Sequence, residues 1–200
     1  MTLQLLEPPT QENCITFYGV SWEQFERIEV ALEGITGVRL TYLDGTLDIM
    51  APLSPEHEDS KSTIGLLLEA YLRENRIRFY VRGGPTLGSR AVGARGEPDE
   101  SYNLETKKDI PDIAIEVVIT SGGVDKLEKY KRWRVPEVWF WHKGKLAIYC
   151  LREQEKQFEY QKLAGSEFLP ELDLVLLENC ANRNDQYDAV NEFTQAIRQE

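Results

Sequence analysis

The stretch Ile110-Pro-Asp-Ile-Ala-Ile-Glu-Val-Val-Ile-Thr120 decides the fold, because it is an almost continuous apolar run with one glutamate near its centre. Its length and its β-branched residues predict a strand that is buried on both faces. Glu116 would then lie inside the protein, where a carboxylate is costly unless it pairs with a cation or binds a metal. A structural ion pair and a functional acid both satisfy this requirement.

A second acidic candidate lies upstream of this strand. Asp99 follows Pro98 in the segment 97–104, which predicts a short strand. If the two strands are neighbours, Asp99 and Glu116 converge on one cation. Mg²⁺ is suited to such a site, because it takes one or two carboxylates and completes its shell with water and phosphate. Pro-Asp pairs are also common in turns, so a purely local role for Asp99 is the alternative.

A lysine downstream completes the candidate set. Asp125 and Glu128 are typical of a capped helix start, which predicts a helix over 125–134 with Lys126 in its first turn. A cation beside an attacked phosphate can orient or deprotonate water. The helix dipole disfavours a lysine at this position, which favours a functional role. The alternative is a solvated lysine on a helix that carries several.

Four further residues are candidates for accessory roles. His57 extends the apolar stripe of a predicted helix, so it either lines the site as an acid or base or is a structural histidine. Asp112 shares a strand face with Glu116 and is either a third acid or a strand-entry residue. Arg90 and Arg95 lie in a Gly-rich stretch that predicts a loop, from which they could contact substrate phosphates.

The remaining elements alternate between helix and strand. An extended lead-in over 1–16 precedes a helix at roughly 21–33 and a hairpin around Asp44-Gly45. The other predicted elements are a helix over 54–75, strands over 78–82, 137–142, 145–151 and 158–163, and helical segments near 172–179 and 186–199. We expect a mixed β-sheet flanked by helices, an α/β class bordering on α+β, in one domain over 1–200.

Composition limits the classes of function. The chain of 200 residues has a formal net charge of −11, which argues against tight non-specific nucleic-acid binding, since phosphate backbones select basic faces. Net charge does not say where the charges lie, so a local basic channel stays open. No apolar run approaches the ~18 residues of a membrane span, and no basic leader is present. Three widely spaced cysteines are typical of reduced thiols, so we expect a cytoplasmic protein.

Several motifs together resemble the signature of the Uma-two family of restriction endonucleases. The resemblance spans roughly residues 20–180, and the ordered combination is far more specific than any single motif. The main motifs are Pro111-Asp-Ile-Ala-Ile-Glu-Val-Val-Ile-Thr-Ser121, Asp125-Lys-Leu-Glu-Lys-Tyr130 and Val135-Pro-Glu-Val-Trp139. The upstream motifs are Tyr42-Leu-Asp-Gly-Thr-Leu-Asp-Ile-Met50 and Ser54-Pro-Glu-His57.

This resemblance implies a restriction endonuclease-like fold of the PD-(D/E)xK superfamily, with DNA as substrate and Mg²⁺, or Mn²⁺ in its place, as cofactor. Carried over by motif, Asp99 and Glu116 are metal-binding acids and Lys126 is a lysine displaced onto the helix. The superfamily lysine usually lies two residues after the glutamate, where this chain has Val118. By analogy with enzymes that cut palindromic duplexes, we expect a homodimer. The alternative is a non-catalytic DNA- or protein-binding regulator on the same fold.

Overall fold

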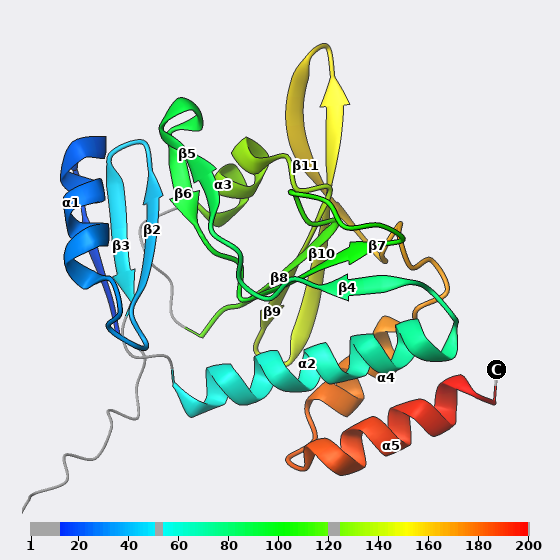
Figure 1. Cartoon of the computed structure of the whole chain (residues 1–200). Helices are drawn as coiled ribbons and strands as arrows, with labels where there is room; N and C mark the ends of the chain where they lie inside the picture. Colours follow the sequence, from blue (N-terminus) through cyan, green and yellow to red (C-terminus); the bar gives the residue numbers. More distant parts are fainter. Residues whose placement is uncertain (1–12, 51–53, 120–124, 200) are drawn as a thin grey trace, which may run out of the picture.

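Strands form two sheets in the computed structural model, which describes residues 13–50, 54–119 and 125–199. The six-stranded sheet has the order β11-β10-β9-β8-β7-β4, in which β8 and β9 are parallel and the other neighbours are antiparallel. Its strands are β4 (Phe79–Val81), β7 (Glu100–Leu104), β8 (Ile113–Val117), β9 (Glu137–His142), β10 (Lys145–Gln154) and β11 (Gln157–Leu163). A mixed sheet flanked by helices confirms the predicted class (Figure 1). Because most of its strand pairs are antiparallel, the fold is better described as α+β than as α/β.

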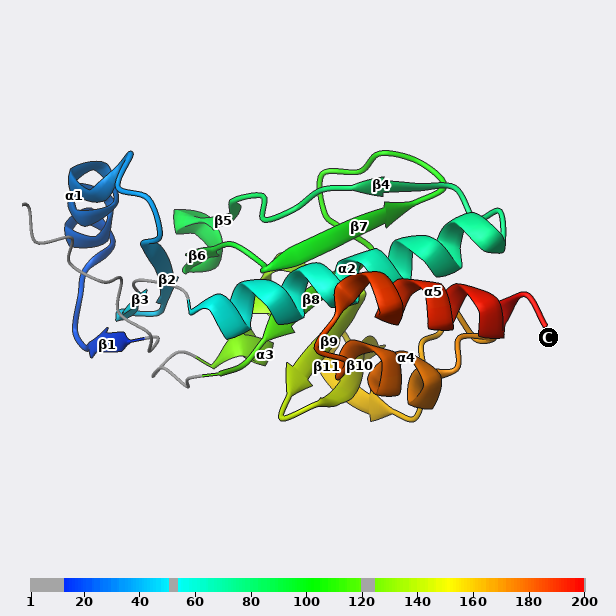
Figure 2. The same ribbon diagram turned by 90° about the horizontal axis from the view of Figure 1, so that it is seen from below.

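Helices cover both faces of this sheet. Figure 2 shows α2, α4 and α5 together beneath it, while α3 connects β8 to β9 from the other side. The helices are α2 (Pro55–Glu74), α3 (Lys126–Trp133), α4 (Leu174–Ala181) and α5 (Gln186–Ile197). Ser54 caps α2 by accepting the His57 N–H, and Pro55 occupies its first turn, as the sequence predicted. The main core lies between α2 and the sheet, with Leu68, Ile115 and similar residues fully buried.

The second sheet is antiparallel, with the order β1-β3-β2-β6-β5. Its strands are β1 (Cys14–Phe17), β2 (Arg39–Leu43), β3 (Thr46–Met50), β5 (Leu87–Ser89) and β6 (Ala94–Gly96). Helix α1 (Trp22–Leu32) packs on it through a small separate core that includes Phe25 and Leu47. Ser21 and Gln24 form a capping box at the start of α1, and the predicted hairpin turn at Asp44-Gly45 is confirmed.

Two expectations need correction, and a third is refined. The sequence predicted one sheet, whereas the described residues form two. The end of the predicted extended lead-in, Cys14–Phe17, is an edge strand paired with β3, and residues 1–12 lie outside the described part. The Gly-rich stretch is not a loop: it is β5, a 3₁₀ turn over Arg90–Val92, and β6. Gly88 is required there, because a Cβ at this position would lie 2.0 Å from the Ala94 carbonyl oxygen.

Three tryptophans belong to the buried core. Trp133, Trp139 and Trp141 are 3%, 0% and 4% exposed. None of the helices in the described ranges has both the length and the apolar character that crossing a membrane requires.

Candidate active site

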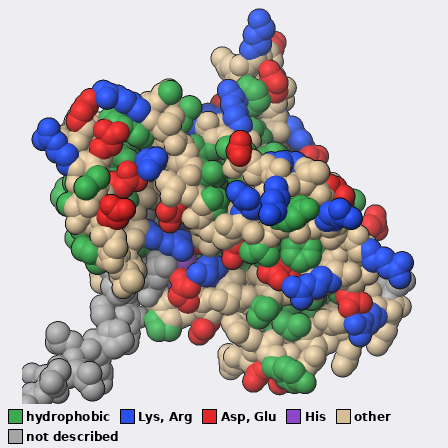
Figure 3. Space-filling view, in the orientation of Figure 1, with side chains coloured by type: hydrophobic (Ala, Val, Ile, Leu, Met, Phe, Trp, Pro, Cys, Tyr) green, Lys and Arg blue, Asp and Glu red, His purple; other side chains and the backbone are tan. Residues whose placement is uncertain are grey.

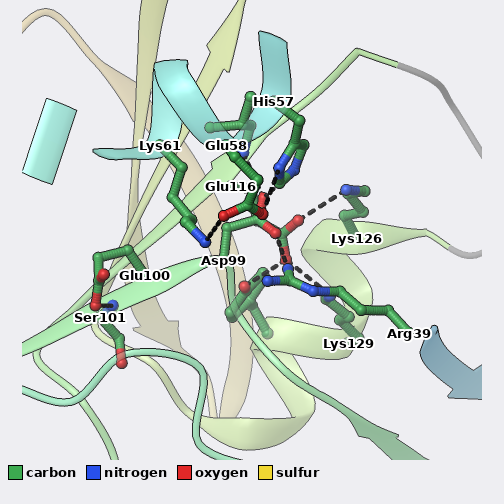
Figure 4. Close-up of polar contacts among 12 residues, drawn as sticks. Arg39, His57, Glu58, Lys61, Asp99, Glu100, Ser101, Glu116, Lys126 and Lys129 are labelled. Atoms are coloured by element: carbon green, nitrogen blue, oxygen red, sulfur yellow. Dashed lines mark hydrogen bonds and ion pairs between the residues drawn. The ribbon is translucent and has the colours of Figure 1, made fainter. Parts of the chain in front are cut away.

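Two buried carboxylates meet where β7 begins and β8 ends. Asp99 directly precedes β7 and is 6% exposed, and Glu116 lies in β8 and is 2% exposed. The two strands are antiparallel neighbours, which meets the condition for the two acids to converge, and the start of one lies beside the end of the other. Asp99 Oδ2 accepts the main-chain N–H of Val117 at 2.7 Å. The backbone therefore fixes Asp99 next to the residue that follows Glu116. Figure 4 shows the two acids together with His57 and Lys126.

Helix α3 supplies three donors to Glu116. Lys126 Nζ lies 2.7 Å from Oε2, while Lys129 Nζ and the Tyr130 hydroxyl lie 2.8 Å and 2.5 Å from Oε1. Asp125 caps the helix by accepting the Glu128 N–H, which confirms the predicted start and places Lys126 in the first turn. In the protein without metal or substrate, Glu116 is therefore a buried acid held in ion pairs, which is the structural one of its two predicted roles. This does not exclude a functional role.

The charges in this cluster follow from burial and pairing. Burial opposes ionisation of Glu116, but the ammonium groups of Lys126 and Lys129 outweigh it and hold the pKa of Glu116 well below its ordinary value. Burial lowers the pKa of Lys129, and the Glu116 carboxylate opposes that shift. Burial, followed by the charge of Glu116, raises the pKa of Tyr130, so its hydroxyl stays protonated and donates. Glu116 is therefore a carboxylate at neutral pH.

Asp99 draws its partners from two other elements. His57, in the first turn of α2, places Nε2 3.2 Å from Asp99 Oδ2. Arg39, the first residue of β2, forms an ion pair with Asp99 Oδ1. Since β2 belongs to the five-stranded sheet, the site lies at the junction of the two sheets.

Each carboxylate has one inner and one outer oxygen. The inner oxygens, Asp99 Oδ2 and Glu116 Oε1, bond to buried groups, including the side chains of His57 and Lys129, which are each 2% exposed. The outer oxygens, Asp99 Oδ1 and Glu116 Oε2, pair with cations that are partly exposed: 23% for the Arg39 side chain and 24% for that of Lys126. The outer oxygens can therefore exchange partners without opening the core.

The donor set fits Mg²⁺. Both acids line a cavity of about 30 Å³, which has room for a cation or one or two water molecules and none for a nucleotide. Within residues 13–50, 54–119 and 125–199, no three His, Cys, Asp or Glu side chains form a ready metal cluster. A cation here would take the two outer oxygens and complete its shell with water and phosphate, which is the usual pattern for Mg²⁺ and unlike that of structural zinc.

The other sequence candidates divide in two groups. The structure brings Lys126 and His57 to the cavity with the two acids. It does not bring Asp112 there, because the Leu104 N–H and the Lys108 ammonium hold this carboxylate at 2.8 Å and 2.7 Å beside the β7–β8 connection. Of the two roles that the sequence left open for Asp112, these contacts favour the strand-entry residue.

Arg90 and Arg95 are engaged by α1. Arg90 pairs with Glu23, and Arg95 Nε donates to Glu29 at 2.6 Å. The flexible clamp expected of a loop is therefore wrong for this hairpin. Arg95 does line a groove of about 470 Å³ that shares Arg39 with the site cavity, so its contact with phosphate stays a prediction.

Sequence reasoning missed Arg39, Lys129 and Tyr130. A signal existed for the last two, because they lie three and four residues after Lys126 and so share its helix face. Arg39 has no such signal, since it is 60 residues from Asp99 and on another sheet.

Comparison with known families points the same way as this geometry. The sequence model of the Uma2 family, described as "Putative restriction endonuclease", matches residues 22–181. The match contains every residue assigned to the site above, from Arg39 to Tyr130. No curated protein matches the chain.

Proposed function

The chain belongs to the Uma2 family and has a restriction endonuclease-like fold, and from this premise we propose that it is a Mg²⁺-dependent endonuclease that hydrolyses phosphodiester bonds in DNA. One observation carries the proposal: Asp99 and Glu116 line one small cavity, and in each carboxylate buried donors hold one oxygen while the other pairs with a partly exposed cation. This arrangement provides a fixed pair of ligands whose cation partners are exchangeable.

Mg²⁺, or Mn²⁺ in its place, would be held by the outer oxygens of Asp99 and Glu116. When bound, such a cation supplies charge stabilisation at the phosphoryl oxygens and lowers the pKa of water. Arg39 and Lys126 have to release the outer oxygens for this to happen. Both side chains are long and partly exposed, so they can turn toward the solvent side, where a phosphate would approach.

The residues around the acids have separate roles in this proposal. The Lys126 ammonium positions or polarises the attacking water, and the Arg39 guanidinium pairs with a non-bridging phosphate oxygen. Lys129 and Tyr130 remain on the inner oxygen and keep Glu116 ionised throughout. His57 orients Asp99 from behind.

Duplex DNA adds a symmetry requirement. Its two strands are related by two-fold axes, so two copies of the chain can present one site to each strand. We therefore propose that cleavage of both strands requires a homodimer. Light scattering measures the molar mass of the chain in solution, and plasmid cleavage shows whether both strands are cut in one binding event. A chain that is a monomer by light scattering and still cuts both strands in one event would contradict the homodimer.

The rival function is a regulator that binds DNA or protein without cutting. The net charge of −11 favours it, since it weakens attraction to phosphate. The two acids and Lys126 favour the enzyme, because a scaffold needs no exchangeable partners at two buried carboxylates.

The deciding experiment is cleavage of supercoiled plasmid and single-stranded DNA with Mg²⁺ or Mn²⁺. Wild type is compared with Asp99→Asn and Glu116→Gln, with circular dichroism as the test of folding. Glu178→Gln is the matched control. Glu178 is in α4, away from the site, and it is also a buried carboxylate in an ion pair, with Lys145 as its partner. We expect wild type and Glu178→Gln to cleave DNA and the two site variants to be inactive. If wild type neither cleaves DNA nor binds metal in calorimetry, the enzyme proposal is refuted and the non-cutting regulator is the remaining function.

A further inference from the structure

Strand β4 is an edge of the six-stranded sheet, and two exposed arginines, Arg78 and Arg82, flank it. Its ladder with β7 continues past both ends, because the Glu105 N–H donates to the Arg78 carbonyl and the Arg82 N–H to the Ser101 carbonyl, each at 2.8 Å. Residues 78–82 are therefore extended, and alternate side chains share a face. Arg78, Tyr80 and Arg82 form one such row.

This row lies on the same sheet face as Glu116. Phe79, between the members of the row, packs against the core beneath α2, so Arg78, Tyr80 and Arg82 point to the opposite face. Glu116 is also on that face, because its partners come from α3. The row and the candidate site can thus contact one ligand that lies across this face.

The cations of the row are unpaired. Lys107 joins them, with its Nζ 5.4 Å from the centre of the Tyr80 ring. Nearby Arg73 and Lys108 are in ion pairs, whereas Arg78, Arg82 and Lys107 have none with any acidic side chain in the described part of the chain. Three exposed cations without such an ion pair therefore lie together along this edge of the sheet. Figure 3 shows Lys and Arg side chains gathered over the region of β4 and β7.

The row also ends close to the acids. Arg82 is opposite Ser101, which is two residues after Asp99. At ~3.3 Å per strand residue and ~4.8 Å between neighbouring strands, the backbones of Arg82 and Asp99 are about 8 Å apart. Arg78 lies about 13 Å farther along the strand. At 3.4 Å per nucleotide along one DNA strand, this length spans roughly four nucleotides.

We propose that Arg78, Arg82 and Lys107 form a phosphate-binding track for the DNA strand on one side of the cleavage point. The inference rests on the proposed function, in that the ligand is the nucleic acid to be cut. The Glu105 and Asp109 side chains of the β7–β8 connection moderate the local charge. They leave the three cations without ion pairs, so the track is the part of this face that complements a polyanion.

The test is DNA binding by the full chain in EDTA, where metal-dependent cleavage is suppressed, measured by anisotropy of labelled duplex and single-stranded DNA at several salt concentrations. The track variant is Arg78→Gln/Arg82→Gln/Lys107→Gln. The matched control is Lys143→Gln/Lys156→Gln/Lys162→Gln, which removes three exposed unpaired lysines near β10 and β11, at the edge of the sheet opposite β4.

We expect the track variant to bind DNA at least ~10-fold more weakly than wild type. The slope of log binding constant against log salt concentration is expected to become less steep by about 0.9 per lost phosphate contact. The control is expected to bind like wild type. Equal binding by the two variants, or no binding by wild type, overturns the track. The proposed function fails separately: binding that depends on the track, without cleavage at any metal concentration, refutes the enzyme and leaves the track in place.

Discussion

The main-chain N–H of Val117 donates a 2.7 Å hydrogen bond to Asp99 Oδ2. Since Val117 follows Glu116 in β8, this bond ties one acid to the backbone that carries the other. The protein itself therefore sets the geometry of the two carboxylates. A cation or a phosphate meets a preorganised pair, which reduces the reorganisation needed on binding.

Replacing Asp99 by asparagine separates shape from charge. The amide oxygen can still accept the Val117 N–H, but it offers no charged oxygen to a metal and no ion pair to Arg39. We expect the variant to fold, to lose about 1–3 kcal/mol of unfolding free energy, and to cleave at least ~100-fold more slowly. Urea unfolding and plasmid cleavage measure the two effects. Cleavage at the wild-type rate would remove Asp99 from the site.

Three lysines of α3 permit a matched comparison. The side chains of Lys126 and Lys131 are each 24% exposed, while that of Lys129 is 2% exposed and bonded to Glu116. We expect Lys126→Met to reduce cleavage by about 100-fold and to cost less stability than the loss of Lys129, because the Lys126 side chain is partly exposed. Lys129→Met is expected to cost about 3 kcal/mol, because it breaks a buried ion pair.

Lys131→Met is the control and is expected to change neither property, since Lys131 pairs only with surface acids. Urea unfolding of all three variants and their single-turnover cleavage rates provide the measurement. If Lys126→Met and Lys131→Met cleave equally fast, the functional role assigned to Lys126 is wrong.

The lowered pKa of Glu116 predicts a specific pH dependence of stability. In the unfolded chain this carboxyl titrates near its ordinary value of 4.5, and in the folded chain it stays ionised below that pH. Its contribution is therefore complete above about pH 4.5 and is lost as the pH falls toward the folded pKa. The difference in unfolding free energy between wild type and Glu116→Gln is expected to be constant from pH 7 to 5 and to shrink below 4.5. A difference that grows on acidification would contradict the sign of the shift.

The sequence was most informative where local pattern alone determines structure. The apolar run around Glu116 and the Asp125 cap placed β8 and α3 correctly, because strand burial and helix capping leave signals within a few residues. The five-stranded sheet was not recognised, because β5 and β6 have three residues each and no periodicity to read. Arg39 could not be found either, since only tertiary packing brings it to Asp99.

Arg39 competes with the proposed metal for Asp99 Oδ1, and this gives an unusual prediction. Removal of its charge by Arg39→Gln is expected to leave Mn²⁺ affinity unchanged or to tighten it, because a positive competitor is lost. Cleavage is nevertheless expected to fall, because the phosphate loses its guanidinium partner. Calorimetric titration with Mn²⁺ and cleavage at saturating metal measure the two quantities separately.

His57→Gln is the matched comparison, because His57 contacts the inner oxygen of the same carboxylate and is not displaced in the proposal. Loss of this support is expected to weaken metal binding by about 10–100-fold. Metal-induced stabilisation gives an independent readout: at a metal concentration 100 times Kd, unfolding free energy rises by about 2.7 kcal/mol. EDTA abolishes that gain, and His57→Gln needs more metal to reach it. If Arg39→Gln instead binds Mn²⁺ more weakly than wild type, Arg39 supports the metal site rather than competing with it, and the exchange of partners at the outer oxygens is refuted.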